Sequence, residues 1–389
     1  MKIVFIANGI IKFKGLPIVS GGDVRFIELG KRWQKKGIEV HVVTPQEGID
    51  LCKKLGLNAI FHRVKNIEGS VILRYIERAL RTKISKEFKD AIIYTVSDLL
   101  CDVLPAVQIK RHLKIPWIAT VHWIEDPPWK RGLRFGRAWI NGYLLCINQR
   151  ITLSLIKRYA DAAFAVSSHT AKQVIDFGVN SKKVYSVKCG IDQDLVERVV
   201  KEIKIKKYDA CYMKRFHPAK GIFDVIKIWK KVCNKIKDAK LALVGYGPPH
   251  LIFQVNKLIR EYKLNRNIDY LGVVYDTNKK FSILKMSKVL LHPSYEENWA
   301  IVIGEAMSCG TPVIAYDLPV LRDIWRMGIV RIPVGNIDGF ANAVIKCLSN
   351  SDFLNRLSNE AKRMASQYSW NKIAEEELYL IKLTIQQRL

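Results

Sequence analysis

Two glutamates, Glu297 and Glu305, are the side chains whose spacing first indicates chemistry. They lie eight positions apart, one just before a predicted helix and one two turns along it. Buried strands are predicted on either side, at Lys288–Pro293 and Thr311–Ala315. Ligands of parallel α/β proteins bind where strands end and helices begin, and the free N–H groups of a helix start attract phosphate. Because carboxylates bind sugar hydroxyls, this combination predicts a nucleotide-sugar site; two solvent-facing glutamates are the alternative.

Two basic residues, Arg215 and Lys220, lie in the loop between a predicted strand, Ala210–Met213, and a predicted helix, Phe223–Asn234. An Arg fork and a Lys point charge together neutralise the charge of a diphosphate. Fixed cations aimed at a departing diphosphate also lower the barrier to its departure. The pair therefore predicts a diphosphate site, with two solvated residues among the 64 basic ones as the alternative.

Glycines mark two further loops. Gly21 and Gly22 precede a predicted helix, Asp23–Lys36, where the missing Cβ lets backbone N–H groups approach a phosphate. A plain helix-entry turn is the alternative there. Gly245 follows the predicted strand Lys240–Val244, but the third glycine of a dinucleotide loop is absent and two prolines follow. A nicotinamide site is therefore not predicted.

His122 ends the predicted strand Trp117–Val121, at the edge expected to face the ligand. A sugar contact and a buried, hydrogen-bonded structural histidine both fit this place. Asp192 and Asp194 form an Asp-x-Asp pair that we interpret as structural. No other carboxylate or histidine cluster has the spacing of metal ligands, so the sequence predicts no metal and no cofactor beyond a co-substrate.

Alternating strands and helices must position these residues. At 389 residues the chain is too long for one ordinary core, and it predicts two α/β domains with doubly wound sheets. The predicted divisions are 1–197, 198–368 and a final helix at 369–389, with a lysine-rich linker near 195–207. Further strands are predicted at Lys2–Ala7, Glu39–Thr44, Ile92–Thr95, Ala162–Val166 and Asp269–Gly272.

The glutamate motif resembles that of a known family. Glu297 and Glu305 are followed by Ala-Met-x-x-Gly-x-Pro-Val-Ile-Ala, which resembles the signature of the family 4 (group 1) retaining glycosyltransferases. The segment Lys214–Gly221 is similar to their Gly-Arg-x4-Lys-Gly motif, with Lys214 where glycine is usual. The resemblance implies an α/β GT-B fold: two Rossmann-like domains, acceptor-side first and nucleotide-sugar second, face a central cleft. Its C-terminal helix crosses back to the first domain.

The resemblance also implies roles for individual residues. Glu297 would stabilise positive charge at the anomeric carbon, and Glu305 would hold the ribose hydroxyls. The implied catalytic residues are His122, Arg215, Lys220 and Glu297. The implied donor-binding residues are Gly21, Gly22, Gly245, Gly272, Val274, Asn298, Trp299, Ala300, Ile301 and Glu305. Asn298 and Ala300 stand where the family usually has glycine, a departure that bears on the choice of sugar.

Charge and composition narrow the partners. The net charge of +28 favours polyanions, although a lysine-rich composition alone is the alternative. No motif supports specific nucleic-acid recognition. The eight cysteines have no close pair, which predicts reduced, buried thiols. Because no segment reaches the roughly 18 consecutive apolar residues of a membrane helix, we predict a protein on the cytoplasmic side that is either soluble or peripheral at the inner face of the membrane.

Two basic clusters interleaved with apolar residues predict where an anionic membrane surface would bind. The first comprises Arg74, Arg78, Arg81, Lys83, Lys86 and Lys89, and the second comprises Lys130, Arg131, Arg134 and Arg137. Ordinary amphipathic helices packed on the sheet are the alternative.

The predicted activity is metal-independent transfer of a hexosyl unit, with retention, from a nucleotide diphosphate sugar to a hydroxyl. A lipid-linked glycan is the acceptor that the basic surface suggests. The alternatives are a sugar-nucleotide epimerase of GT-B fold and a non-catalytic basic binding protein.

Overall fold

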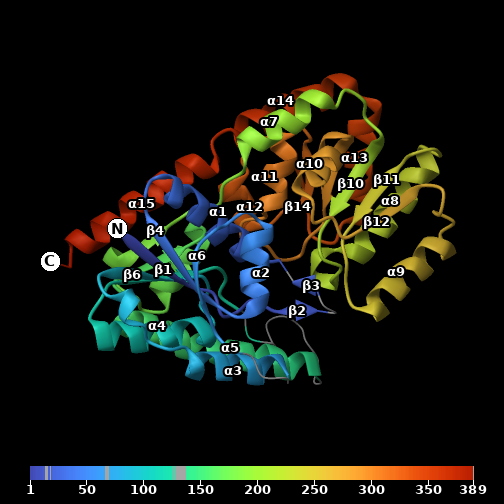
Figure 1. Ribbon diagram of the computed structural model, residues 1–389. Helices are drawn as coiled ribbons and strands as arrows, with labels where there is room; N and C mark the ends of the chain where they lie inside the picture. The colour runs from blue at the N-terminus through green and yellow to red at the C-terminus, as the bar shows by residue number, and fades with distance from the viewer. Residues whose placement is uncertain (14–15, 18, 66–69, 126, 128–136, 389) are drawn as a thin grey trace. The chain divides into compact units, whose positions relative to one another are not determined.

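The computed structural model describes the whole chain except residues 14–15, 18, 66–69, 126, 128–136 and 389 (Figure 1). The chain divides into two compact units. The first comprises Met1–Cys189 and Trp370–Leu389, and the second comprises Gly190–Ser369. The predicted boundary at residue 197 falls inside a helix, α7 (Gln193–Glu202). The predicted three-part division stays a prediction.

A seven-stranded parallel sheet forms the middle of the first unit, in the order β5-β4-β1-β6-β7-β8-β9. Its strands are β1 Lys2–Ile6, β4 Glu39–Thr44, β5 Ile60–Arg63, β6 Ala91–Thr95, β7 Trp117–Val121, β8 Ala162–Ala165 and β9 Val184–Ser186. A small hairpin, β2 Lys12–Phe13 and β3 Leu16–Pro17, follows β1. The run Ile3–Ile6 is fully buried, because a parallel sheet is covered on both faces.

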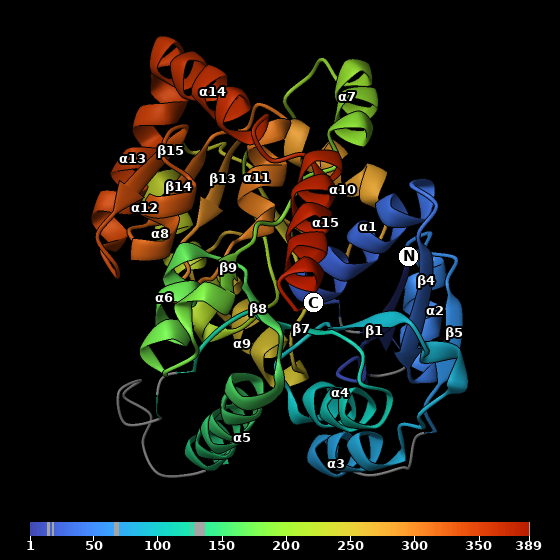
Figure 2. The same cartoon turned by 90° about the vertical axis from the view of Figure 1, so that its left-hand side faces the viewer.

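Helices cover the faces of this sheet. They are α1 Gly21–Lys35, α2 Gln46–Lys54, α3 Val71–Arg81, α4 Leu100–Leu113, α5 Arg137–Tyr159 and α6 Ser168–Asp176, with 3-10 turns η1 Lys86–Phe88 and η2 Ser181–Lys183. Helices α3 and α5 both pack on α4, at one edge of the unit in both views (Figures 1 and 2). Arg78 of α3 was predicted to face a membrane, but it is fully buried. Its guanidinium donates to the carbonyls of Asn8 and Ile10 and pairs with Glu47 at 3.0 Å.

The last helix, α15 (Trp370–Gln386), returns to the first unit and packs on α1 (Figure 2). Trp33 Nε1 donates to the carbonyl of Ala374 at 2.9 Å. Arg25 of α1 forms a buried ion pair with Glu377 of α15, and the hydroxyl of Tyr94 donates to the same carboxylate. These contacts fasten the end of the chain to the sheet that begins it.

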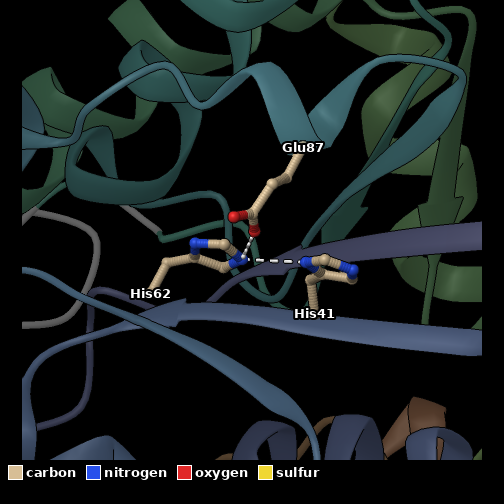
Figure 3. Close-up of side chains that lie close together, drawn as sticks. All are labelled: His41, His62 and Glu87. Atoms are coloured by element: carbon tan, nitrogen blue, oxygen red, sulfur yellow. Dashed lines mark hydrogen bonds and ion pairs between the residues drawn. The ribbon is translucent and has the colours of Figure 1, made fainter.

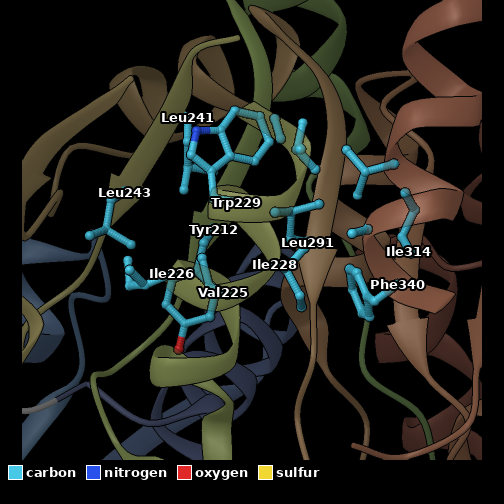
Figure 4. Close-up of a cluster of buried hydrophobic side chains, with 14 of the residues drawn as sticks. Tyr212, Val225, Ile226, Ile228, Trp229, Leu241, Leu243, Leu291, Ile314 and Phe340 are labelled. Atoms are coloured by element: carbon cyan, nitrogen blue, oxygen red, sulfur yellow. The ribbon is translucent and has the colours of Figure 1, made fainter. Parts of the chain in front are cut away.

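The second unit contains six parallel strands in the order β12-β11-β10-β13-β14-β15. They are β10 Tyr208–Met213, β11 Leu241–Val244, β12 Ile268–Gly272, β13 Ser287–His292, β14 Val313–Tyr316 and β15 Ile329–Ile332. The helices are α8 Ile222–Lys235, α9 Pro249–Glu261, α10 Thr277–Lys285, α11 Ile301–Ser308, α12 Pro319–Ile324, α13 Ile337–Ser349 and α14 Ser351–Ala365. Trp229 of α8 packs in the core with Leu241 and Leu291 (Figure 4).

The predicted linker near 195–207 is wrong over its first part, where the chain forms α7. Val196 and Val199 of this helix are buried, and the helix packs on α10. Asp192 caps it by accepting from the N–H of Leu195 at 3.2 Å, in keeping with its predicted structural role. Lys201 lies on the solvent side of this amphipathic helix, and Lys204, Lys206 and Lys207 follow its end, so composition alone misled the prediction.

Within the described residues, no helix has both the length and the apolar character needed to cross a membrane.

Candidate active site

Two adjacent strands of the second unit, β10 and β13, define the place of the candidate site. They are neighbours in the sheet although β11 and β12 lie between them in sequence. The strand order therefore reverses at this point, which is where open α/β sheets bind ligands at their carboxyl ends. Lys214 directly follows β10, and His292 is the last residue of β13. Glu297 follows five residues later, before α11.

Glu297 is a nearly buried carboxylate with several polar neighbours, its side chain only 9% exposed. Lys214 Nζ forms an ion pair with Oε1, and Ser294 Oγ donates to the same oxygen at 2.7 Å. Lys220 Nζ lies 3.5 Å from that oxygen. Burial opposes ionisation, but the charges of Lys214 and Lys220, together with His292, hold the pKa of Glu297 well below its ordinary value. The carboxylate is therefore ionised at neutral pH.

Among the cations beside Glu297, Lys214 is the one that loses its charge most readily. Burial lowers the pKa of Lys214 to about 8, although the attraction of Glu297 opposes this shift. A lysine can release its proton when it is buried, whereas an arginine cannot. The ion pair with Glu297 therefore weakens just above neutral pH.

His292 is a buried histidine whose ring nitrogens have no hydrogen-bond partner among the described residues. Its Nε2 lies 3.4 Å from Glu297 Oε1. Burial, followed by the charge of Lys214, lowers the pKa of His292 to about 4, so the ring is neutral at neutral pH. A buried polar side chain without a partner is uncommon and costs free energy, which is typical of a site that a ligand completes.

The predicted diphosphate loop begins after β10 and includes the 3-10 turn η3 (Pro218–Lys220). Lys220 Nζ donates to the carbonyl of Glu296 at 2.7 Å, which ties the loop to the glutamate segment. The hydroxyl of Tyr212 donates to the carbonyl of Lys220 at 3.1 Å. Arg215 is exposed. Its guanidinium and the ammonium of Lys220 are the cations that this loop offers to a diphosphate.

Gly221 is required where this loop enters α8. Its φ is +73°, a left-handed conformation that favours glycine, and a Cβ would lie 1.8 Å from the carbonyl oxygen of Pro293. The loop after β10 and the loop after β13 therefore pass in direct backbone contact. This close approach explains why Lys220 reaches the segment that carries Glu297.

Helix α11 begins with an unusual residue, Ala300, whose φ is +58°. The left-handed conformation costs a residue with a Cβ about 1–2 kcal/mol, which explains the glycine expected at this position. No side chain in the described part of the chain caps α11, so its first N–H groups are available to an anion that approaches beyond Ile301. The side chain of Trp299 packs in a buried cluster with Trp325 and Tyr368. Donor binding by the backbone N–H groups of this loop, which the resemblance implies, stays a prediction.

Glu305 lies on α11 and is buried, with Lys280 of α10 as its ion-pair partner. Gly245 and Gly272, in the same unit, meet each other, because the N–H of Gly245 donates to the carbonyl of Gly272 at 2.9 Å. A Cβ on Gly245 would lie 1.9 Å from the carbonyl oxygen of Lys214. The loops after β10, β11 and β12 thus converge. Val274, two residues beyond β12, is half-buried, as is Asn298 on the glutamate segment.

In the first unit, the structure brings together three of the predicted residues. Gly21 and Gly22 open α1, and a Cβ on Gly22 would lie 2.9 Å from His122 Nε2. His122 Nε2 donates to the carbonyl of Val96 at 2.7 Å. Burial and the nearby Arg25 lower the pKa of His122 to about 4, so the imidazole is neutral. The predicted approach of these residues to the charges of the second unit stays a prediction.

Known protein families match the sequences of both units. Residues 19–195 match the family described as Glycosyltransferase Family 4, and residues 195–364 match the family described as Glycosyl transferases group 1. The chain belongs to the family 4, group 1 glycosyltransferases. The resemblance drawn from the glutamate motif is confirmed, and the alternatives of an epimerase and of a non-catalytic binding protein are set aside.

Individual relatives of this glycosyltransferase differ in what they act on. The N-acetyl-alpha-D-glucosaminyl L-malate synthase of Bacillus anthracis is 24% identical over 384 residues, covering 92% of this chain and 93% of that protein. The phosphatidyl-myo-inositol mannosyltransferase of Mycobacterium leprae is 29% identical over 163 residues, covering 41% and 42%. The crystal structure of Anabaena HepE in complex with UDP matches with a TM-score of 0.75 at 17% identity, covering 98% of this chain and all of that one. The predicted GT-B fold is confirmed.

Four residues of the candidate site were not predicted from the sequence: Lys214, His292, Ser294 and Lys280. The first had a signal, since Lys214 replaces a glycine of the family motif. Ser294 and His292 flank the end of β13, where any polar side chain is a candidate. Lys280 lies on a separate helix, and nothing in its local sequence indicates that it pairs with Glu305.

Proposed function

We propose that this glycosyltransferase transfers a hexosyl unit from a nucleoside diphosphate sugar to a hydroxyl acceptor, with retention of configuration and without a metal. The observation that carries the proposal is the ionised Glu297, held by Ser294 and flanked by Lys214 and Lys220 at the strand-order reversal. An anion suits the developing positive charge of a sugar ring, and cations suit the departing diphosphate. Both charges are fixed before the reaction, so they require little reorganisation.

In the proposed reaction, the bond between the anomeric carbon and the diphosphate oxygen breaks, and its electron pair leaves with the diphosphate. Arg215, Lys220 and the N–H groups that open α11 would stabilise this growing negative charge. The acceptor oxygen attacks the same face of the sugar, and its proton passes to the departing phosphate oxygen. Glu297 would stabilise the ring charge without forming a bond to it. Glu305 would hold the ribose hydroxyls, with Lys280 orienting its carboxylate.

His122 would complete the donor site from the first unit. Its neutral ring, with Nε2–H committed to Val96, leaves Nδ1 as the atom for hydrogen bonding to a sugar hydroxyl. Gly21 and Gly22 would bring backbone N–H groups close to the diphosphate. Gly245, Gly272, Val274, Asn298 and Ala300 keep their predicted donor-binding roles as part of the proposal.

The acceptor that we propose is lipid-linked, because the first unit exposes an apolar face on α3 and α5. We define the α3–α5 face by its exposed large side chains, which recur at helical spacing: Leu73, Ile76, Leu80, Ile140, Leu144, Ile147 and Ile151. Leu73 is 62% and Leu80 65% exposed, values unusual for leucine side chains arranged on one helix face. The mannosyltransferase of Mycobacterium leprae acts on a lipid, phosphatidyl-myo-inositol.

Basic residues beside this face favour an anionic bilayer over another protein. Arg81, Lys83, Lys86, Lys89 and Arg150 are all exposed close to it in sequence. Each basic residue near an anionic surface contributes on the order of 1 kcal/mol. We therefore propose peripheral attachment at the inner face of the membrane. The second predicted basic cluster includes Lys130, Arg131 and Arg134, which lie outside the described residues.

Two experiments test the proposed function. A thermal-shift screen of the full-length protein against UDP-, GDP- and ADP-sugars should show stabilisation by one donor class, and that donor should then be consumed only when an acceptor is present. Turnover without acceptor, or no stabilisation by any donor, would contradict the proposal.

Flotation with phosphatidylcholine vesicles containing about one-third phosphatidylglycerol should recover the wild type but not Leu73→Ser/Leu80→Ser. If the wild type does not bind vesicles at low salt, the proposed membrane attachment is wrong. If the protein self-associates on a sizing column, the α3–α5 face binds a second copy of the chain instead.

A further inference from the structure

The first unit holds a cluster of metal-ligating side chains that the glycosyltransferase reaction does not use. His41 lies on β4, His62 on β5 and Glu87 on the turn η1, and their side chains point toward one another (Figure 3). Each offers one ligand atom, and the three atoms lie within 4.8 Å of one another. The cluster lies near the amino ends of β4 and β6, whereas His122 follows the carboxyl end of β7.

The distances are close to those that a metal ion would impose. His41 Nδ1 lies 2.8 Å from His62 Nε2, and His62 Nε2 lies 3.7 Å from a carboxylate oxygen of Glu87. Two nitrogens bound to one tetrahedral zinc ion are about 3.3 Å apart, given Zn–N bonds of about 2.0–2.1 Å. The rings would have to part by about half an ångström and turn toward the ion. Glu87 is exposed on a short turn, so its carboxylate is free to close on the same point.

A fourth residue, Glu39, supports His41 from behind. Its carboxylate accepts a hydrogen bond from His41 Nε2 at 2.6 Å, on the side of the ring away from His62. Metal-binding histidines usually donate their second ring N–H to a carboxylate, which fixes the tautomer and the ring orientation. With Nε2 protonated in this way, His41 Nδ1 carries the lone pair that a metal requires.

The surroundings also fit a small, partly dry site. Phe88 is buried and packs edge-on against both imidazole rings. Lys2 is the nearby cation, with Nζ 3.6 Å from Glu39 and 2.8 Å from the carbonyl of Glu87. These bonds of Lys2 go to the Glu39 carboxylate and to the backbone carbonyl of Glu87, so neither involves an atom that would bind the metal.

We propose that His41, His62 and Glu87 bind one zinc ion, with Glu39 orienting His41 and water completing the coordination. Two imidazoles and one carboxylate are a donor set that zinc binds well and that magnesium does not favour. The ion would join β4, the edge strand β5 and the turn before β6. It would therefore strengthen the edge of the first sheet and take no part in sugar transfer.

The test uses untagged full-length protein, stripped with a chelator and then dialysed against micromolar Zn²⁺. Elemental analysis should find one zinc per chain, and Co²⁺ in its place should give the visible absorption of a tetrahedral site. His62→Gln and Glu87→Gln should lose the bound ion, whereas Glu39→Gln should bind it about 10- to 100-fold more weakly. His112→Gln removes an exposed histidine on α4 and is the matched control that should bind normally.

Zinc should also raise the melting temperature of the wild type and leave that of His62→Gln unchanged. If wild-type protein retains no zinc, or if His62→Gln and Glu87→Gln retain it in full, the proposal fails and the two histidines are a structural hydrogen-bonded pair. Glu87→Gln changes an exposed side chain, so it decides the question even if His62→Gln does not fold. Sugar transfer by the metal-free wild type tests the proposed function separately, because the two outcomes are independent.

Discussion

Two buried ion pairs, Arg25 with Glu377 in the first unit and Lys214 with Glu297 in the second, have opposite designs. The first pair is sealed: Arg25 also donates to the Tyr94 hydroxyl and to the carbonyl of Lys188, and both side chains are at most 2% exposed. The second pair has further polar neighbours, because Lys220 and His292 also approach Glu297. A saturated pair fastens two helices. A pair with additional polar neighbours leaves some of these groups able to bind a ligand.

The choice of cation reinforces this difference. Arginine stays charged when buried, so Arg25 needs Glu377 at every pH. Lysine can lose its proton, and the pKa of Lys214 is already lowered to about 8. The cation of the structural pair therefore keeps its charge over the physiological range, whereas the cation of the pair in the candidate site can lose its charge. The predictions that follow are arranged to separate the two kinds of pair.

The largest expected effect is on the sealed pair. Glu377→Gln leaves the Arg25 charge buried with neutral partners only, and it should lower the free energy of unfolding by about 3–5 kcal/mol. Urea unfolding of the full-length protein measures this change. Glu376→Gln alters a more exposed neighbour, paired with Lys188 at 3.4 Å, and should cost less than about 1 kcal/mol. Equal effects of the two variants would remove the distinction between sealed and exposed pairs.

The next effect concerns the diphosphate loop. Lys220→Ala removes a cation proposed to stabilise the departing diphosphate, and it should lower kcat/KM for the donor by about 100- to 1000-fold. Lys227→Ala removes an exposed charge from α8 and should leave the rate unchanged. Initial rates of radiolabelled sugar transfer give both values. A normal rate for Lys220→Ala would exclude this lysine from the reaction.

A smaller effect is expected from pH. Lys214 loses its charge above about pH 8, so the transfer rate should fall by about tenfold per pH unit beyond that point. Since the pKa of Lys214 is lower in the folded than in the unfolded chain, the unfolded chain binds more protons above pH 8. The contribution of this group to the free energy of unfolding therefore rises with pH while the activity falls.

Two variants identify the group behind this pH dependence. Lys214→Met should abolish the fall above pH 8. Lys206→Met should retain it, although burial also lowers the pKa of Lys206 to about 8, because Lys206 lies before β10 and bonds to the carbonyls of Lys285 and Ser287. If the fall persists in Lys214→Met, another group is responsible.

The smallest expected effect tests backbone strain at the start of α11. Ala300→Gly relieves the left-handed conformation, and it should raise the free energy of unfolding by about 0.5–1 kcal/mol after the added freedom of the unfolded glycine is subtracted. Urea unfolding again provides the value, with the donor Kd measured beside it. Destabilisation by Ala300→Gly would show that the Ala300 methyl group contributes packing that outweighs the strain.

Much of the fold could be predicted from the sequence, because parallel strands buried on both faces appear as apolar runs. The strands Glu39–Thr44 and Trp117–Val121 were predicted with the bounds that the structure has. Helix α7 was missed because the exposed Lys201 and the lysines that follow the helix concealed a short apolar stripe. Amphipathic helices with few apolar positions are the elements most easily mistaken for linkers.

The residues of the candidate site could be predicted where they belong to a sequence motif. They could not be predicted where contacts between distant segments bring them into the site. Glu297 and Lys220 were identified from their motifs, and the structure places them 3.5 Å apart. The pairing of Lys214 with Glu297 and that of Lys280 with Glu305 join segments far apart in sequence. The resemblance assigned Trp299 to the donor through the backbone N–H groups of its loop, and it did not indicate that the ring lies in an aromatic cluster. Sequence order cannot show which way a side chain points from a loop.

The most direct measurement of the central claim is donor binding and sugar transfer by Glu297→Gln, compared with Glu296→Gln. The account predicts that Glu297→Gln binds the nucleotide sugar within about tenfold of the wild-type Kd by calorimetry, yet transfers sugar about 100- to 1000-fold more slowly. Glu296→Gln should behave as the wild type in both assays. Transfer at the wild-type rate by Glu297→Gln would contradict the assignment of this carboxylate to the reacting sugar.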